Sequence, residues 1–325
     1  MPPGLETERA IRTVDPHFGV VYLPFGRAWP DILTDVLRIE SLGFDSLWIP
    51  DHLIAPDNPS RPVLEGWSLL AGLAAQTTHL RFGTLVSPAG LRNPAHLGKV
   101  IATVDQISGG RLTPGFGAGW AEAEYRAFNM PFPSTPDRFD QLREVVQFLR
   151  RFWREPEVTF TGDHVRVTDV VCTPRLESPP PLLIAAGGEK RGLRVVAEEA
   201  DIWTNSSGGH EQLEHKLDVL HAHCDAVGRD PTVIRISQQC LVGIAPDTAA
   251  LAVLIAAARS AANEEVDVAR HPLALTGTPS QIVARIEQHL ELGCSMFMLD
   301  FFGPYPLELA SLFAREVLPR FRRTE

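Results

Sequence analysis

The sequence lacks the cysteine pairs that mark disulfide frameworks and many zinc sites. Its 325 residues include four cysteines, at positions 172, 224, 240 and 294, and none belongs to a C-x-x-C pair. Isolated thiols of this kind are typical of the reducing cytosol, so we expect free cysteines. Histidines and a cysteine gather at 215–224, but they would not share one face of a helix, and no metal site is predicted.

Long apolar runs and an excess of positive charge are also lacking. The longest apolar run, 251–258, is far shorter than the roughly 18–20 residues that span a bilayer. The first residues hold no apolar stretch of the kind found in secretory signals, and 1–15 are predicted to form a flexible polar tail. The net charge of −10 argues against a general nucleic-acid or membrane surface. We therefore expect a cytoplasmic protein without nucleic-acid or membrane partners.

Eight short apolar runs alternate with helical patterns along the rest of the chain. The runs are 17–23, 46–50, 80–86, 111–117, 182–187, 201–205, 233–244 and 295–301. The helical patterns are 29–42, 65–76, 94–107, 135–153, 189–199, 211–227, 247–260 together with 279–292, and 306–318. This alternation predicts an α/β fold, a (β/α)8 TIM barrel with insertions, as one domain over 16–325. An open doubly wound sheet is the main alternative.

Two segments exceed a minimal barrel. Residues 155–172 contain two β-like runs around Thr161-Gly162-Asp163, which predicts a hairpin insertion. Residues 259–276 form a polar, less regular link between two helices and are predicted to be a second insertion. Pro114 lies within the fourth apolar run and cannot donate a ladder hydrogen bond, so we expect a bulge or a late strand start there.

The glycine-rich stretch 115–119, Gly-Phe-Gly-Ala-Gly, admits two interpretations. A dinucleotide-binding loop needs G-x-G-x-x-G after the first strand and an acidic residue further on, and neither condition is met. In a barrel, Gly117 and Gly119 would end the fourth strand at the carboxyl-terminal rim, where small residues let a planar ligand approach the backbone. The second interpretation fits both the position and the spacing.

A barrel rim also predicts polar residues at the other strand ends, and the sequence has them. Asp51 and His52 follow the second run, and Ser87 ends the third. The turns after the fifth and sixth runs, 187–191 and 204–209, are rich in glycine and polar residues. Backbone N–H groups and a helix N-terminus would make them a phosphate cradle, with ordinary strand-to-helix connections as the alternative.

Five blocks of the sequence resemble one known family. The blocks are 42–53 (LGFDSLWIPDHL), 80–100, 107–128 (with SGGRLTPGFGAGWAEAEY), 185–203 and 290–301. They are similar to blocks of the bacterial luciferase-like monooxygenase superfamily, most closely to its branch that uses the deazaflavin coenzyme F420. The resemblance implies a TIM barrel that binds F420, or alternatively reduced FMN, at its carboxyl-terminal rim. It also implies a homodimer, because relatives are often dimers.

The resemblance also implies positions for the cofactor. Gly187, Gly188 and the 205–206 turn would hold the phosphate, and a non-prolyl cis peptide behind the central ring would map to Leu85-Val86. The full set of cofactor-binding candidates is Leu85, Val86, Ser87, Asn93, Gly117, Gly119, Gly187, Gly188, Glu189, Lys190, Asn205 and Ser206.

His52 is the candidate for proton transfer, because an imidazole can give or take a proton near neutral pH. Asp51 would hold His52 or contact the ring, with capping of the next segment as the alternative. Glu122 is the candidate catalytic acid, since some relatives place one after the fourth strand; Glu122 and Glu124 could equally be solvated carboxylates of a first helical turn. The candidate substrate-pocket residues are Phe25, Trp67, Trp120 and Tyr125.

The choice of cofactor decides the chemistry. F420 would favour hydride transfer to or from a small organic substrate, and the likeness of 42–53 and 107–128 favours this interpretation. Reduced FMN would favour an oxygen-dependent monooxygenase supplied by a separate reductase. A non-catalytic flavin-binding barrel and an unrelated aldolase are further alternatives. The aldolase needs a Schiff-base lysine at a strand end, and none of the three lysines, Lys99, Lys190 and Lys216, lies within a predicted strand.

Overall fold

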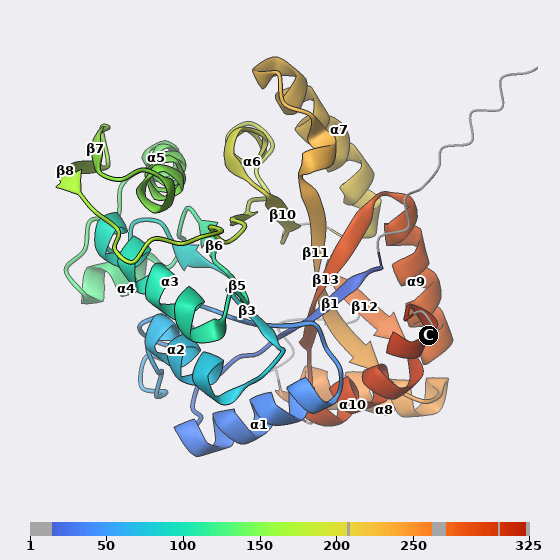
Figure 1. The fold of residues 1–325 in the computed structure, drawn as a ribbon. Coiled ribbons are helices and arrows are strands. Elements are labelled where there is room, and N and C mark those ends of the chain that lie inside the picture. The colour runs from blue at the N-terminus through green and yellow to red at the C-terminus, as the bar shows by residue number, and fades with distance from the viewer. Residues whose placement is uncertain (1–14, 207–208, 262–270, 305, 323–325) are drawn as a thin grey trace, which may run out of the picture.

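The computed structural model describes residues 15–206, 209–261, 271–304 and 306–322. Eight parallel strands surround a common axis, two of them interrupted. They are β1 (His17–Val21), β2 (Ser46–Ile49), β3 (Arg81–Thr84) continued by β4 (Ser87–Pro88), β5 (Leu112–Thr113) continued by β6 (Gly115–Gly117), β9 (Leu183–Ala185), β10 (Ile202–Asn205), β11 (Arg235–Ile244) and β13 (Cys294–Phe301). The predicted α/β barrel is confirmed (Figure 1).

The barrel closes through the interrupted fourth strand. β5 pairs with β3 on one side, and β6 pairs with β9 on the other. The break between β5 and β6 falls at Pro114, which has no N–H to donate, so the predicted irregularity there is confirmed. β13 pairs with β1 and completes the ring.

Helices cover the outside of the barrel (Figure 1). They are α1 (Trp29–Ser41), α2 (Gly66–Gln76), α3 (Pro94–Ser108), α4 (Glu122–Ala127), α5 (Thr135–Arg154), α6 (Gly192–Glu199), α7 (His210–Val227), α8 (Thr248–Ala261), α9 (Pro279–Glu291) and α10 (Pro306–Glu316), with short 3-10 helices at Pro231–Val233 and Leu318–Arg320. Within the described ranges, no helix is both long and apolar enough to cross a membrane.

Two pairings lie in the segments that exceed a minimal barrel. β7 (Val158–Thr161) and β8 (Arg166–Val170) form an antiparallel hairpin between α5 and β9. β12 (Ala274–Gly277) pairs with the second half of β11, at the end of the segment for which the sequence suggested only a polar link. Residues 262–270 of that segment, and the predicted tail over 1–14, lie outside the described residues.

Successive side chains of a strand point to opposite faces, so the barrel has two hydrophobic clusters, one inside it and one under the helices. Val21, Trp48, Leu183, Met296 and Met298 form a cluster that fills the barrel interior. The residues between them on the strands pack outward against the helices in a larger cluster. Because all eight strands are parallel, their carboxyl ends meet at one rim, which is where active sites of this fold lie.

We predict that Gly115→Ala destabilises the protein by about 1–3 kcal/mol. A Cβ at Gly115 would lie 2.1 Å from the backbone oxygen of Thr84, on the neighbouring strand. That oxygen cannot move away freely, because the Thr84 hydroxyl also hydrogen-bonds to the backbone of Gly115. Urea unfolding measures the loss, and Gly188→Ala is the control, because a Cβ there meets nothing within 4 Å. Equal stability of the two variants would contradict the prediction.

Candidate functional site

A cavity of about 400 Å³ opens at the carboxyl-terminal rim, and we call it the mouth cavity. Its lining comes from the ends of β2, β3, β4, β6, β9 and β10, from the middle of β11 and from α5. The lining residues are His52, Leu85, Val86, Pro88, Gly117, Ala118, Gly119, Trp120, Phe139, Ala185, Ala186, Gly187, Ser206 and Gln239. Eight of these are residues that the sequence singled out, so the structure brings much of the predicted site together.

The wall formed by Leu85, Val86 and Gly117 is tightly packed. The Leu85-Val86 peptide bond is cis, as the resemblance implied. A Cβ at Gly117 would lie 2.7 Å from a methyl group of Val86, so only glycine lets β6 pass this close. Gly119 has a φ of +81°, which favours glycine, and its missing side chain leaves room for the Tyr125 hydroxyl. The glycine stretch therefore shapes a cavity wall.

His52 is held at the cavity by a buried carboxylate. Its Nδ1 lies 3.1 Å from Oε2 of Glu124, whose side chain is 2 % exposed. The other oxygen of Glu124 accepts hydrogen bonds from the backbone N–H groups of Leu53 and Ile54. These contacts fix the imidazole ring and leave Nε2 as the nitrogen that a ligand in the cavity can reach. Such a histidine–carboxylate pair can carry a proton.

Burial acts to raise the pKa of Glu124, but its hydrogen bonds from His52 and from the two amides outweigh burial. The pKa of this carboxyl is therefore lowered below its usual value of 4.5. Glu124 consequently stays ionised across the neutral range and remains a hydrogen-bond acceptor for His52.

The structure corrects the role assigned to Glu122. Its side chain is exposed and forms an ion pair with Arg126 at 2.7 Å, one turn along α4. Glu124, two residues further, faces the barrel instead. Because residues two apart on a helix point in different directions, only one of the two carboxylates can reach His52.

Asp51 does not hold His52 and does not line the mouth cavity. Its carboxylate accepts two hydrogen bonds from Arg92, at 2.6 and 2.8 Å, and a third from the Ser87 hydroxyl at 2.6 Å. Arg92 also bonds Glu65, the N-cap of α2. Ser87 further accepts a hydrogen bond from the indole N–H of Trp67. These residues form a buried polar cluster behind the cavity.

Trp67 and Tyr125 are also corrected, because both are buried away from the mouth cavity. Trp67 is 2 % exposed and Tyr125 is 1 % exposed. Tyr125 packs against Phe132 instead. Of the proposed substrate-pocket residues, Trp120 lines the cavity, and Phe25 contacts the His52 ring at 6.2 Å between centroids.

Only part of the proposed phosphate cradle lines the cavity. Gly187 and Ser206 are among its lining residues, and Gly188 is open to solvent, while 207–208 lie outside the described residues. Asn205 is buried behind the strand end, where its amide donates to Gln238. Three further candidates have other roles. Asn93 caps α3, Glu189 pairs with His215, and Lys190 is exposed and outside the lining.

Sequence reasoning missed six lining residues: Pro88, Ala118, Phe139, Ala185, Ala186 and Gln239. Gln239 carried a usable signal, because it is a polar residue within an apolar run and lies two positions from Leu241 on the same face of β11. The alanines carried none, since small apolar residues are common in every barrel strand. Within the described residues, no cluster of possible metal ligands occurs.

A family model described as luciferase-like monooxygenase matches residues 17–295. The chain belongs to this family. It is 28 % identical to a protein of Kineococcus radiotolerans named F420-dependent glucose-6-phosphate dehydrogenase, over 90 % of this chain and 94 % of that one.

Two solved structures share its fold. One is an F420-dependent secondary alcohol dehydrogenase in complex with an F420–acetone adduct, with a TM-score of 0.79, 21 % identity, and coverage of 95 % of this chain and 100 % of that one. The other is the oxygenating constituent of 3,6-diketocamphane monooxygenase of Pseudomonas putida in complex with FMN, with a TM-score of 0.75, 16 % identity, and coverage of 96 % and 100 %.

We predict that Glu124→Gln destabilises the protein by about 1–3 kcal/mol at pH 7, because an amide cannot accept all the hydrogen bonds of the carboxylate. The lowered pKa means that the carboxylate stabilises the fold above its unfolded pKa and loses this effect as the pH falls through the folded pKa. The difference between wild type and variant should therefore shrink on acidification towards pH 3.

Urea unfolding at pH 7 and near pH 3 measures this difference. Glu122→Gln is the matched control, and its exposed ion pair should change the stability by less than about 0.5 kcal/mol. A larger loss for Glu122→Gln than for Glu124→Gln would show that the two carboxylates have been assigned the wrong way round.

Proposed function

We propose that the protein is an F420-dependent oxidoreductase that transfers a hydride between the deazaflavin and a small organic substrate. The observation that carries this proposal is the His52–Glu124 pair, which sets an imidazole nitrogen at the edge of a glycine-walled cavity. The F420-dependent names of the Kineococcus relative and of the alcohol dehydrogenase support the choice of cofactor.

The cavity fits a planar, phosphate-bearing cofactor. Val86 and Gly117 line one wall of the cavity, and the missing side chain of Gly117 leaves backbone there against which a ring system can lie. Gly187 borders the same cavity, and Gly188 leads towards the N-terminus of α6 with open space around it. Backbone N–H groups there, together with Ser206, would bind the phosphate of the cofactor.

The deazaflavin, when bound, accepts the hydride from the substrate or returns it. The protein supplies the proton transfer that must accompany this step. In the direction of alcohol oxidation, Nε2 of His52 takes the hydroxyl proton, and the ionised Glu124 stabilises the resulting imidazolium through Nδ1. Trp120, whose ring meets that of His52 edge-on at 5.7 Å, limits the positions that the imidazole can adopt.

Reduced FMN is the second candidate cofactor, and the FMN complex among the similar folds favours it. The protein would then be an oxygen-dependent monooxygenase with a flavin reductase as partner. A non-catalytic flavin-binding barrel has less support, because such a protein has no need of a buried carboxylate that orients His52. A cytoplasmic location and a homodimer remain part of the proposal, and sedimentation of the purified protein tests the dimer.

Titration of the apoprotein with F420 and, separately, with FMN tests the proposal, each cofactor being used oxidised and reduced. We expect F420 to bind at least tenfold more tightly than FMN, a difference of about 1.4 kcal/mol. Quenching of cofactor fluorescence measures the binding of both oxidised forms. Tighter binding of FMN would make the protein a flavin monooxygenase, and binding of neither would refute the cofactor site.

We predict that His52→Gln lowers the turnover of F420 about 100- to 10,000-fold with the best alcohol from a panel of secondary alcohols. Binding of F420 should change little, because His52 borders the cavity at its edge. Stopped-flow reduction of F420 measures the rate, and His79→Gln serves as the control, since His79 is exposed on the far side of β3. Full turnover by His52→Gln would remove His52 from the mechanism.

A further inference from the structure

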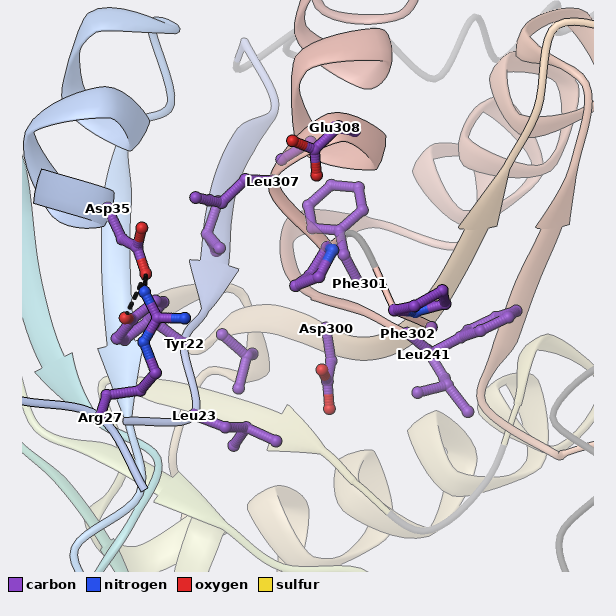
Figure 2. A pocket seen from close by; sticks show the side chains of 16 residues that line it. Tyr22, Leu23, Arg27, Asp35, Leu241, Asp300, Phe301, Phe302, Leu307 and Glu308 are labelled. Carbon is purple, nitrogen blue, oxygen red and sulfur yellow. Dashed lines mark hydrogen bonds and ion pairs between the residues drawn. The ribbon is translucent and has the colours of Figure 1, made fainter. Parts of the chain in front are cut away.

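A second, larger cavity of about 520 Å³ lies beside the first, and we call it the β1–β13 cavity (Figure 2). It is bordered by the ends of β1, β11 and β13 and by α1 and α10. The two cavities adjoin across β11, because Gln239 lines one and Leu241, two residues on and on the same face, lines the other. The loop after β1 also joins them: Leu23 lines the second cavity, and Phe25 contacts His52.

Asp300 projects into this second cavity from β13 (Figure 2). Met296 and Met298, on the same face of the strand, fill the barrel interior below it. The register pairs Asp300 with Leu241 of β11, so an apolar side chain is its neighbour. Among the described residues, none forms a hydrogen bond or an ion pair with Asp300. Burial raises the pKa of its carboxyl to about 6.

Among the described residues that line this cavity, no cation is left for a phosphate. Arg27 is the cation among the described lining residues, and Asp35 holds it in an ion pair at 2.6 Å. The Tyr22 hydroxyl donates to the same oxygen of Asp35 (Figure 2). Glu308 on α10 adds a further negative charge and faces Arg38 at 3.7 Å. A dianionic ligand would meet an acidic wall with its one arginine already neutralised.

The rest of the lining is apolar. It includes Leu23, Leu241, Phe301, Phe302 and Leu307. A ligand that fits this cavity therefore has a largely hydrocarbon skeleton and one hydrogen-bond donor for the Asp300 carboxylate, which projects into the cavity without a partner among the described residues.

We propose that the β1–β13 cavity binds the substrate and that Asp300 accepts a hydrogen bond from a substrate hydroxyl other than the one that His52 deprotonates, which makes the substrate a phosphate-free alcohol with at least two hydroxyl groups. This inference rests on the proposed oxidoreductase function and narrows its substrate class. It separates this chain from the relative named for glucose 6-phosphate.

Three probes test the inference: cyclohexanol, cyclohexyl phosphate and glucose 6-phosphate, each titrated calorimetrically into the protein with and without F420. We expect cyclohexanol to bind at least tenfold more tightly than either phosphate ester. Asp300→Asn should weaken cyclohexanol binding about tenfold, the loss expected for a hydrogen bond to a charged group. Equal or tighter binding of a phosphate ester, or no binding of any probe, would overturn the proposal.

The pH profile separates recognition by Asp300 from a structural effect. Wild type should bind cyclohexanol at least fivefold more weakly at pH 5 than at pH 8, because protonation removes the charged acceptor. The Asp300→Asn variant should show no such dependence. This variant should also unfold at a higher temperature than wild type at pH 8, since desolvation disfavours the charged form of Asp300 in the folded protein. If the variant keeps the pH dependence of wild type, Asp300 does not have the proposed role.

Asp218→Asn, an exposed substitution on α7, controls for the loss of one negative charge and should behave as wild type. Cofactor fluorescence in the same samples separates the two proposals. Failure of wild type to bind F420 would refute the proposed function. Normal F420 binding without any preference for the alcohol would refute this inference about the substrate and leave the proposed function standing.

Discussion

The buried ion pair between Asp51 and Arg92 is the interaction on which the candidate site depends. It joins the end of β2 to the segment after β4. Both terminal nitrogens of Arg92 donate to the carboxylate of Asp51, so the contact is bidentate. Removing one partner of such a pair typically costs about 3–5 kcal/mol, because the other charge is left buried and alone. Asp51 meets Arg92 behind the cavity, and the next residue, His52, lines the mouth cavity, where Glu124 orients it. A contact behind the cavity therefore anchors the segment that carries the candidate proton carrier.

Much of the fold could be read from the sequence, because burial on both faces of a parallel strand leaves a strong pattern. Each of the eight apolar runs contains a barrel strand, and the interruption at Pro114 followed from its missing N–H. β12 was missed because its four residues, 274–277, follow a polar segment. Their sequence, Ala-Leu-Thr-Gly, shows no alternation of apolar and polar residues. Its partner is the unusually long β11, and such a pairing is set by tertiary contacts that local sequence does not encode.

For the candidate site, the sequence predicted only which strand ends would form it. Position along the chain predicted that His52, Gly117 and Gly187 would meet at one rim, because parallel strands end together. The choice between Glu122 and Glu124 depended on the phase of a six-residue helix, which no periodic pattern fixes over so short a length. Likewise, a tryptophan after a strand suits a pocket wall or a core equally well. Trp67 is in the core because its N–H finds the Ser87 hydroxyl there.

The two cavities at the barrel mouth differ in the residues that line them. The mouth cavity is walled by glycine and alanine, which expose backbone and admit a ring, and it reaches the small-residue turns where a phosphate can bind. The β1–β13 cavity instead has large apolar side chains and acidic groups, which disfavour a second anion. In the proposed function, a phosphate-bearing cofactor would bind on one side and a neutral substrate on the other. Since His52 lies at the edge of the first and contacts the loop that lines the second, a proton can be exchanged where the two ligands would meet.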